Sequence, residues 1–360
     1  MTDLLALTAE LVDIASPSGG EDALADHVER VLRQVPWLQV ERLGDNVVAR
    51  TDLARSQRLI LAGHLDTVPG QGNESARLEG DTLWGLGAAD MKAGLAVFLD
   101  LATTVADPAV DVTYVFYTCE EVEQDRSGLG RLFAERPALL VGDAAVLGEP
   151  TDGAVEAGCQ GSLRLAITLM GRRAHTARPW MGVNAIHRLG RLLAVIDEWE
   201  GRRPVLDGCE FREAIQAVGV EAGVAGNVVP DRATVTLNHR FAPDRSAEVA
   251  LAHLRELLGD IVGPEDEVTV LDQVDGAPPG LDHPLLAALV NGGDGDADGL
   301  EVRSKLGWTD VARFAAHGVP ACNFGPGDPT LAHAPDERVG RAALDAVHGA
   351  LRSLLEIGAP

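Results

Sequence analysis

Strand-like and helix-like hydrophobic patterns alternate through the first part of the chain. Segments 58–69 and 110–121 are rich in apolar, β-branched and aromatic residues and predict strands. Segment 143–151 predicts a shorter strand. Residues 91–105 repeat apolar side chains at helical spacing and predict a helix. This alternation is typical of an α/β fold.

The pattern changes from about Gly161. The chain then predicts strand, helix, strand, strand, helix and strand, in the segments 161–171, 183–199, 213–223, 233–241, 246–262 and 266–274. This order is that of a ferredoxin-like sandwich, and Pro278–Pro279 marks a linker after it. We therefore expect one α/β domain, residues 1–160 and 276–360, interrupted by a smaller domain, residues 161–275.

Two short glycine-rich segments resemble known ligand loops but lack a residue that those loops need. Residues 294–299 match the first half of an EF-hand, yet the twelfth loop position is Lys305, so a flexible acidic turn is the better prediction. In 85–90 the third glycine of a dinucleotide-binding loop is replaced by Asp90. Neither segment predicts a calcium or nucleotide site.

Length and charge narrow the class of protein. At 360 residues the chain is long enough for two domains, and its net charge of −25 disfavours nucleic acid and anionic membranes as partners. No apolar run reaches transmembrane length, and acidic residues stand where a secretory leader carries lysines. The four cysteines form no CxxC pair. We expect a soluble cytoplasmic protein with free thiols.

Potential metal ligands follow several of the predicted strands or precede a helix. They are His64, Asp66, Asp90, Glu120, Glu121, Glu149 and His333. Any one of them alone is more simply a solvated or core residue, but functional residues of open α/β sheets gather at the carboxyl ends of strands. Imidazoles together with carboxylates suit zinc, and also cobalt or manganese.

Six motifs, in this order, resemble those of the dizinc aminoacylase/carboxypeptidase amidohydrolases. They are GHLDTVP, GLGAADMKAG, TCEEVE, GEPT, GRRAHTARP and the late AHAPDE. The resemblance covers essentially the whole chain. It implies a zinc-peptidase-like catalytic domain, a mixed sheet flanked by helices, interrupted by an inserted ferredoxin-like α+β lid through which two copies form a homodimer.

The resemblance also implies the roles of the candidate ligands. Asp90 would bridge two zinc ions per subunit, with cobalt or manganese as alternatives, and the Asp90–Met91 peptide bond would be cis. The ligand pairs completing the two sites would be His64 with Glu149, and Glu121 with His333. Asp66 would hold the His64 imidazole in its ligating tautomer.

Glu120 would be the general base that takes a proton from the bridging water and delivers it to the leaving amine. Neighbouring residues of an extended strand point to opposite sides. Glu120 and Glu121 can therefore both serve the site only if the strand ends in a turn there.

Further residues match positions that relatives use toward the substrate. His175 would stabilise the oxyanion across the dimer interface, although a surface histidine is the simpler alternative. Asn227 matches another residue supplied by the partner, with an ordinary turn residue as the alternative. Arg240 would bind a carboxylate of the substrate, because a guanidinium can donate to both of its oxygens. The remaining pocket candidates are Ser162, Thr309, Arg313 and, with a solvated arginine equally plausible, Arg178.

The late segment GWTDVARF, with NFGPGD after it, resembles the branch that removes succinate from N-succinyl-LL-2,6-diaminopimelate. Cys159 and Gln160 replace arginines common in that branch, and Asp328 stands where an asparagine is usual, which leaves recognition of the acyl chain open. The alternatives are another N-acyl-amino-acid amidohydrolase such as an acetylornithine deacetylase, a metallo-carboxypeptidase or dipeptidase, or a binding protein that has lost catalysis.

Overall fold

The computed structural model describes residues 2–292 and 299–359, and these form two compact units. The first unit comprises residues 1–158, 279–303 and 310–360, and the second comprises 159–278 and 304–309. The sequence predicted breaks at 160/161 and 275/276, so segment 304–309 is an addition to the inserted unit that the sequence pattern did not show. The predicted acidic turn at 294–299 lies, apart from its last residue, outside the described residues.

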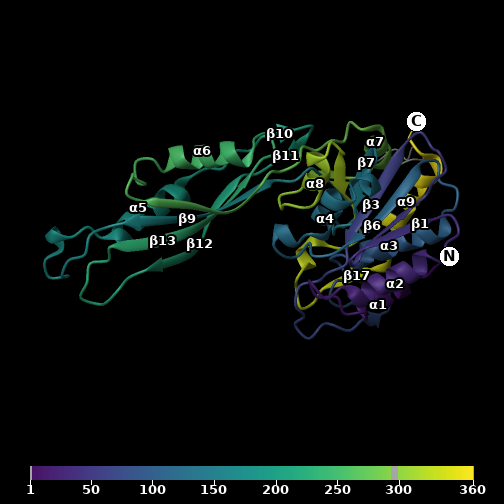
Figure 1. Ribbon diagram of the computed structural model, residues 1–360, viewed down its shortest axis with the longest axis horizontal. Coiled ribbons are helices and arrows are strands. Elements are labelled where there is room, and N and C mark those ends of the chain that lie inside the picture. The colour runs from purple at the N-terminus through teal and green to yellow at the C-terminus, as the bar shows by residue number, and fades with distance from the viewer. Residues whose placement is uncertain (1, 293–298, 360) are drawn as a thin grey trace. The chain divides into compact units, whose positions relative to one another are not determined.

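The first unit contains most of the regular structure (Figure 1). Its helices are α1 (Leu4–Val12), α2 (Asp22–Leu32), α3 (Lys92–Thr104), α4 (Gly128–Glu135), α7 (Pro284–Val290), α8 (Val311–Ala316) and α9 (Arg341–Ile357), with 3₁₀ turns η1 (Gln124–Arg126), η2 (Pro137–Leu140) and η4 (Pro329–Leu331). Its strands are β1 (Gln39–Leu43), β2 (Asn46–Arg50), β3 (Arg58–His64), β4 (Arg77–Glu79), β5 (Thr82–Trp84), β6 (Asp111–Tyr117), β7 (Ala144–Leu147), β8 (Val155–Ala157), β15 (Val302–Ser304), β16 (Ala321–Asn323) and β17 (Arg338–Gly340).

A mixed eight-stranded sheet of order β1-β2-β6-β3-β7-β16-β8-β15 forms the centre of this unit. Its middle strands β6, β3, β7 and β16 are parallel, whereas β2 pairs antiparallel with β6 and β8 with β16. β6 is buried along its whole length, as expected for a central strand covered on both faces. The carboxyl ends of β3, β6 and β7 therefore open at one edge of the sheet.

Helices cover both faces of this sheet. On one face α3 is buried over most of its length and packs with α1, α2 and α9, and α7 packs with α9. Leu59 and Leu61 of β3 belong to the same core. On the other face α4 and α8 meet through an edge-on contact of Phe133 with Phe314, 5.3 Å between ring centroids. The predicted mixed sheet flanked by helices is confirmed.

One glycine lets α3 approach the end of β7. A Cβ at Gly94 would lie 2.2 Å from the carbonyl oxygen of Gly148, a distance that no larger residue tolerates without displacing backbone. This approach brings the start of α3, which follows Asp90, against the loop that carries Glu149. Two candidate ligands far apart in sequence are thereby placed on neighbouring loops.

The inserted unit has the predicted ferredoxin-like order. Its elements are β9 (Gly161–Met170), η3 (Pro179–Met181), α5 (Ala185–Glu198), β10 (Val205–Leu206), β11 (Cys209–Glu210), β12 (Ala214–Ala222), β13 (Arg232–Phe241), α6 (Ala247–Leu257) and β14 (Glu267–Val274). The four long strands form an antiparallel sheet of order β12-β13-β9-β14, and α5 and α6 share one core with it. The opposite face is exposed along β12 and β14.

The helices of the described residues include none whose length and apolar character would let it cross a bilayer. All four cysteines are buried and unpaired with each other.

Candidate metal centre

The loops after three parallel strands and before one helix bring the predicted ligands together. β3 ends at His64, β6 leads into Glu120 and Glu121, and β7 leads into Glu149. Asp90 stands just before α3, and its peptide bond to Met91 is cis, as predicted. The chain therefore concentrates carboxylates and imidazole at one sheet edge, where the topology requires loops.

The donor atoms of His64, Asp90 and Glu121 all lie within 4.8 Å of one another. His64 Nε2 is 3.1 Å from Asp90 Oδ1, and His333 Nε2 is 3.4 Å from Asp90 Oδ2 and 2.8 Å from Glu121 Oε1. The two oxygens of Asp90 thus face two different imidazoles. A carboxylate that bridges two cations needs this arrangement, and the nitrogen and oxygen donors suit zinc.

The neighbouring carboxylates raise the pKa of both histidines. Burial opposes protonation of His64, but bonds to Asp66 and Asp90 hold its pKa well above the ordinary value. Hydrogen bonds to Asp90 and Glu121 raise the pKa of His333 to about 10. Burial alone would raise the pKa of Asp90, yet the same two histidines lower it. Positive charge is therefore favoured here, and divalent cations would take the place of these protons.

Glu149 lies beside His64 and Glu120. It is buried, and its charge raises the pKa of both neighbours. Burial, followed by repulsion from Glu149, holds the pKa of Glu120 well above its ordinary value. A carboxylate in this setting accepts a proton readily, as a general base at this position must.

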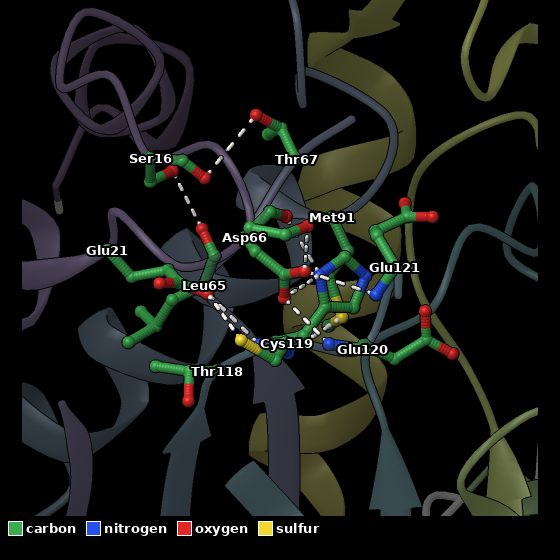
Figure 2. A network of polar contacts seen from close by, with 12 residues as sticks. Ser16, Glu21, Leu65, Asp66, Thr67, Met91, Thr118, Cys119, Glu120 and Glu121 are labelled. Carbon is green, nitrogen blue, oxygen red and sulfur yellow. Dashed lines mark hydrogen bonds and ion pairs between the residues drawn. The ribbon is translucent and has the colours of Figure 1, made fainter. Parts of the chain in front are cut away.

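Glu120 and Glu121 follow a sharp turn after β6, and Figure 2 shows the polar contacts between this turn and Asp66. Cys119 takes a left-handed backbone with φ of 57°, which ends the extended course of β6. The Asp66 carboxylate then accepts both following amides, from Glu120 N at 3.0 Å and Glu121 N at 3.1 Å. The strand end is a turn fixed by a buried acid.

Asp66 has a second contact, with the His64 ring. His64 Nδ1 is 2.9 Å from the backbone oxygen of Asp66 and 3.5 Å from its carboxylate, so the carbonyl is the nearer acceptor that sets the tautomer. Burial alone would raise the pKa of Asp66, but bonds from His64, Glu120 N and Ser18 lower it to about 2. The carboxylate therefore both contacts the His64 ring and orders the Glu120–Glu121 turn.

The predicted substrate residues lie mostly in the inserted unit. His175 and Asn227 are exposed on adjoining loops, where Thr176 N donates to Asn227 O at 3.1 Å. Arg240 and Ser162 face each other across β13 and β9. Thr309 is buried in this unit, and Arg178 is exposed. Arg313 belongs to the other unit, where its Nε donates to Asp310 at 2.7 Å.

Three buried acids near the centre have no counterpart in the sequence prediction. Glu21, at the start of α2, accepts Cys119 N at 3.0 Å. Glu337 accepts three amides of the loop before Asp90. Asp310 is buried against Arg313. Two of the three lay within motifs quoted above: Glu337 stands four residues after His333 in AHAPDE, and Asp310 follows Thr309 in GWTDVARF.

Comparison with known proteins agrees with this geometry. The model of the family described as "Peptidase family M20/M25/M40" matches residues 60–357. A Mycobacterium tuberculosis protein provisionally named succinyl-diaminopimelate desuccinylase is 51% identical over 98% of both chains. The succinyl-diaminopimelate desuccinylase of Corynebacterium glutamicum is 45% identical over 93% of this chain and 91% of its own.

Solved structures share the fold at lower identity. A tripeptidase from Staphylococcus aureus superposes with a TM-score of 0.79 at 20% identity, covering 99% of this chain and 97% of its own. A Bacillus subtilis protein described as a dinuclear metal-binding peptidase superposes with a TM-score of 0.73 at 16% identity, covering 98% and 96%. The matched family model and the close relatives together show that this chain belongs to peptidase family M20/M25/M40.

Proposed function

We propose that this protein hydrolyses the amide bond of N-succinyl-LL-2,6-diaminopimelate to succinate and LL-2,6-diaminopimelate, a step toward lysine and diaminopimelate. One observation carries the reaction class. Two imidazoles converge on the two oxygens of Asp90, with Glu120 on the adjoining turn. The choice of substrate rests on the relatives at 45–51% identity and their names.

Two divalent metal ions, zinc by preference, would be held by His64, Asp90, Glu121, Glu149 and His333. Bound there, they would polarise the amide carbonyl and make the attacking water acidic. Glu120 accepts the proton of that water and returns it to the leaving amine. Arg240 would bind a substrate carboxylate, with Ser162, Thr309, Arg313 and Arg178 as further contacts.

We also propose a cytoplasmic homodimer joined through the inserted unit. β12 is one of the two outer strands of its sheet and exposes Val218 and Val220, and an open apolar edge of this kind readily pairs with a second chain. His175 and Asn227 would then reach the partner's metal centre as oxyanion donors. No disulfide joins any of the four cysteines, all of which lie among the described residues, and this agrees with a reducing compartment.

Hydrolysis of N-succinyl-diaminopimelate and of N-acetylornithine by the zinc-loaded protein tests the substrate. We expect kcat/KM to be at least 100-fold higher for the succinyl compound. Equal rates, or none on either compound, would refute the assignment.

Heterodimers of Glu120→Gln with His175→Ala chains test the shared site. If His175 acts across the interface, one site per heterodimer has both groups and activity returns. If His175 acts within its own chain, the mixture stays inactive.

A further inference from the structure

We propose that Glu337 is a positioning residue that holds the Asp90 loop in its metal-binding shape. The inference rests on the metal centre proposed above and assigns a role to a residue outside the ligand set. Its basis is the set of hydrogen bonds that one buried carboxylate makes to the backbone before Asp90.

The Glu337 side chain accepts three backbone amides from one short loop. Oε1 accepts Ala89 N at 2.8 Å and Asp90 N at 2.9 Å, and Oε2 accepts Gly87 N at 3.0 Å. The residue is only 2% exposed, so water cannot easily replace these bonds. Hydrogen bonds from backbone amides to a buried carboxylate are costly to leave unmade, and three of them fix the path of the loop.

The same residue ties this loop to the segment that carries His333. Glu337 O accepts Gly85 N at 3.1 Å, and Glu337 N donates to Ala334 O at 3.1 Å, one residue after His333. Side chains of Gln71 and Asn73 also donate to the carbonyls of His333 and Ala334, at 3.3 Å each. Glu337 thus fixes the distance between the proposed bridging ligand and a terminal ligand.

Groups that orient metal ligands typically change metal affinity or activity by 10- to 100-fold when removed. Glu337 binds backbone amides of the Asp90 loop rather than the Asp90 side chain. We expect its removal to lower metal affinity in the same way. Without the three bonds, the Asp90 loop is free to move in the metal-free protein. Metal binding must then order the loop, and this costs conformational entropy. The predicted defect is therefore in zinc affinity, and excess zinc should restore part of kcat.

Zinc titration of the metal-free protein against a chromophoric chelator tests the proposal. Glu337→Gln keeps the size of the side chain but turns one acceptor into a donor that faces a backbone N–H; Glu337→Ala removes all three bonds. We expect zinc affinity to fall about 10-fold or more in the Gln variant and further in the Ala variant. Asp336→Asn, at an exposed neighbour that pairs with Arg338, is the matched control and should bind zinc normally.

Circular dichroism of each metal-free variant separates loss of fold from loss of affinity. A folded Gln variant with wild-type zinc affinity would overturn the inference, even if its melting temperature fell. If the Ala variant does not fold, the Gln variant decides. If the wild-type protein itself bound no zinc, the proposed metal centre would fall and this inference with it.

Discussion

The metal centre and the two residues proposed as oxyanion donors, His175 and Asn227, are built in opposite ways. Every proposed metal ligand and Glu120 belong to the first unit, and their loops are held by buried carboxylates that accept backbone amides, Asp66 and Glu337 among them. His175 and Asn227 belong to the inserted unit, where both are exposed on loops. The loops of the first unit are thus ordered by the fold itself, whereas the roles proposed for His175 and Asn227 would also require a second chain and the substrate.

The largest effect should come from removing the general base in the preorganised unit. Glu120→Gln should lower kcat by roughly 100- to 10,000-fold, because the amide cannot take the proton of the attacking water. Zinc content should stay at the wild-type level, since Glu120 is not a proposed ligand. Steady-state kinetics together with elemental analysis would check both points.

Glu123→Gln is the matched control, because Glu123 is exposed on the same segment and pairs only loosely with Arg126. It should retain full activity. Loss of zinc from the Glu120 variant would mean that the roles of Glu120 and Glu121 are exchanged.

A smaller effect should follow from removing the proposed carboxylate anchor in the inserted unit. Arg240→Ala should raise KM by roughly 10- to 100-fold, the value of a charge-assisted hydrogen bond, and leave zinc binding unchanged. Arg232→Ala, at an exposed position on the same strand, is the control and should behave as wild type. An unchanged KM in the Arg240 variant would remove this residue from the substrate site.

The smallest effect concerns the stability of the inserted unit. Burial, with repulsion from Arg245 and His253, lowers the pKa of His239 from 6.5 to about 4, although its bond to Ala214 O opposes this. Between pH 6.5 and 4, His239 is protonated in the unfolded chain but neutral in the folded chain. The free energy of unfolding therefore falls as the pH falls toward 4. The loss is roughly 1 kcal/mol per pH unit.

Urea unfolding of the metal-free protein at pH 7, 6 and 5 would measure this slope. His239→Gln should flatten it, because the variant has no group to titrate there. The same slope in wild type and variant would show that His239 is not the source.

The sequence predicted the features that depend on local patterns. Buried strands such as β3 and β6, helix α3 and the ferredoxin-like order of the inserted unit follow from hydrophobic periodicity. The candidate ligands were identified because they stand at strand ends and match family motifs. The predicted helix at 246–262 was too long: α6 ends at Leu257, since the chain turns at Leu258.

The sequence did not predict features that arise from contacts over long separations. Glu337 and Asp90 are 247 positions apart, and a carboxylate that accepts backbone amides leaves no pattern in its own neighbourhood. The three-stranded sheet of β4, β5 and β17 was missed for a similar reason, because each of these strands has only three residues. Short strands are stabilised by their pairing and carry too little alternation to be recognised.

The central claim is that one unit of the chain holds two metal ions around Asp90. An anomalous-scattering map at the zinc edge, from crystals grown with excess zinc, tests it most directly. We expect two peaks, one on each side of the Asp90 carboxylate, the first shared with His64 and the second with His333. A map with no peak at Asp90, or with zinc bound only elsewhere, would contradict it.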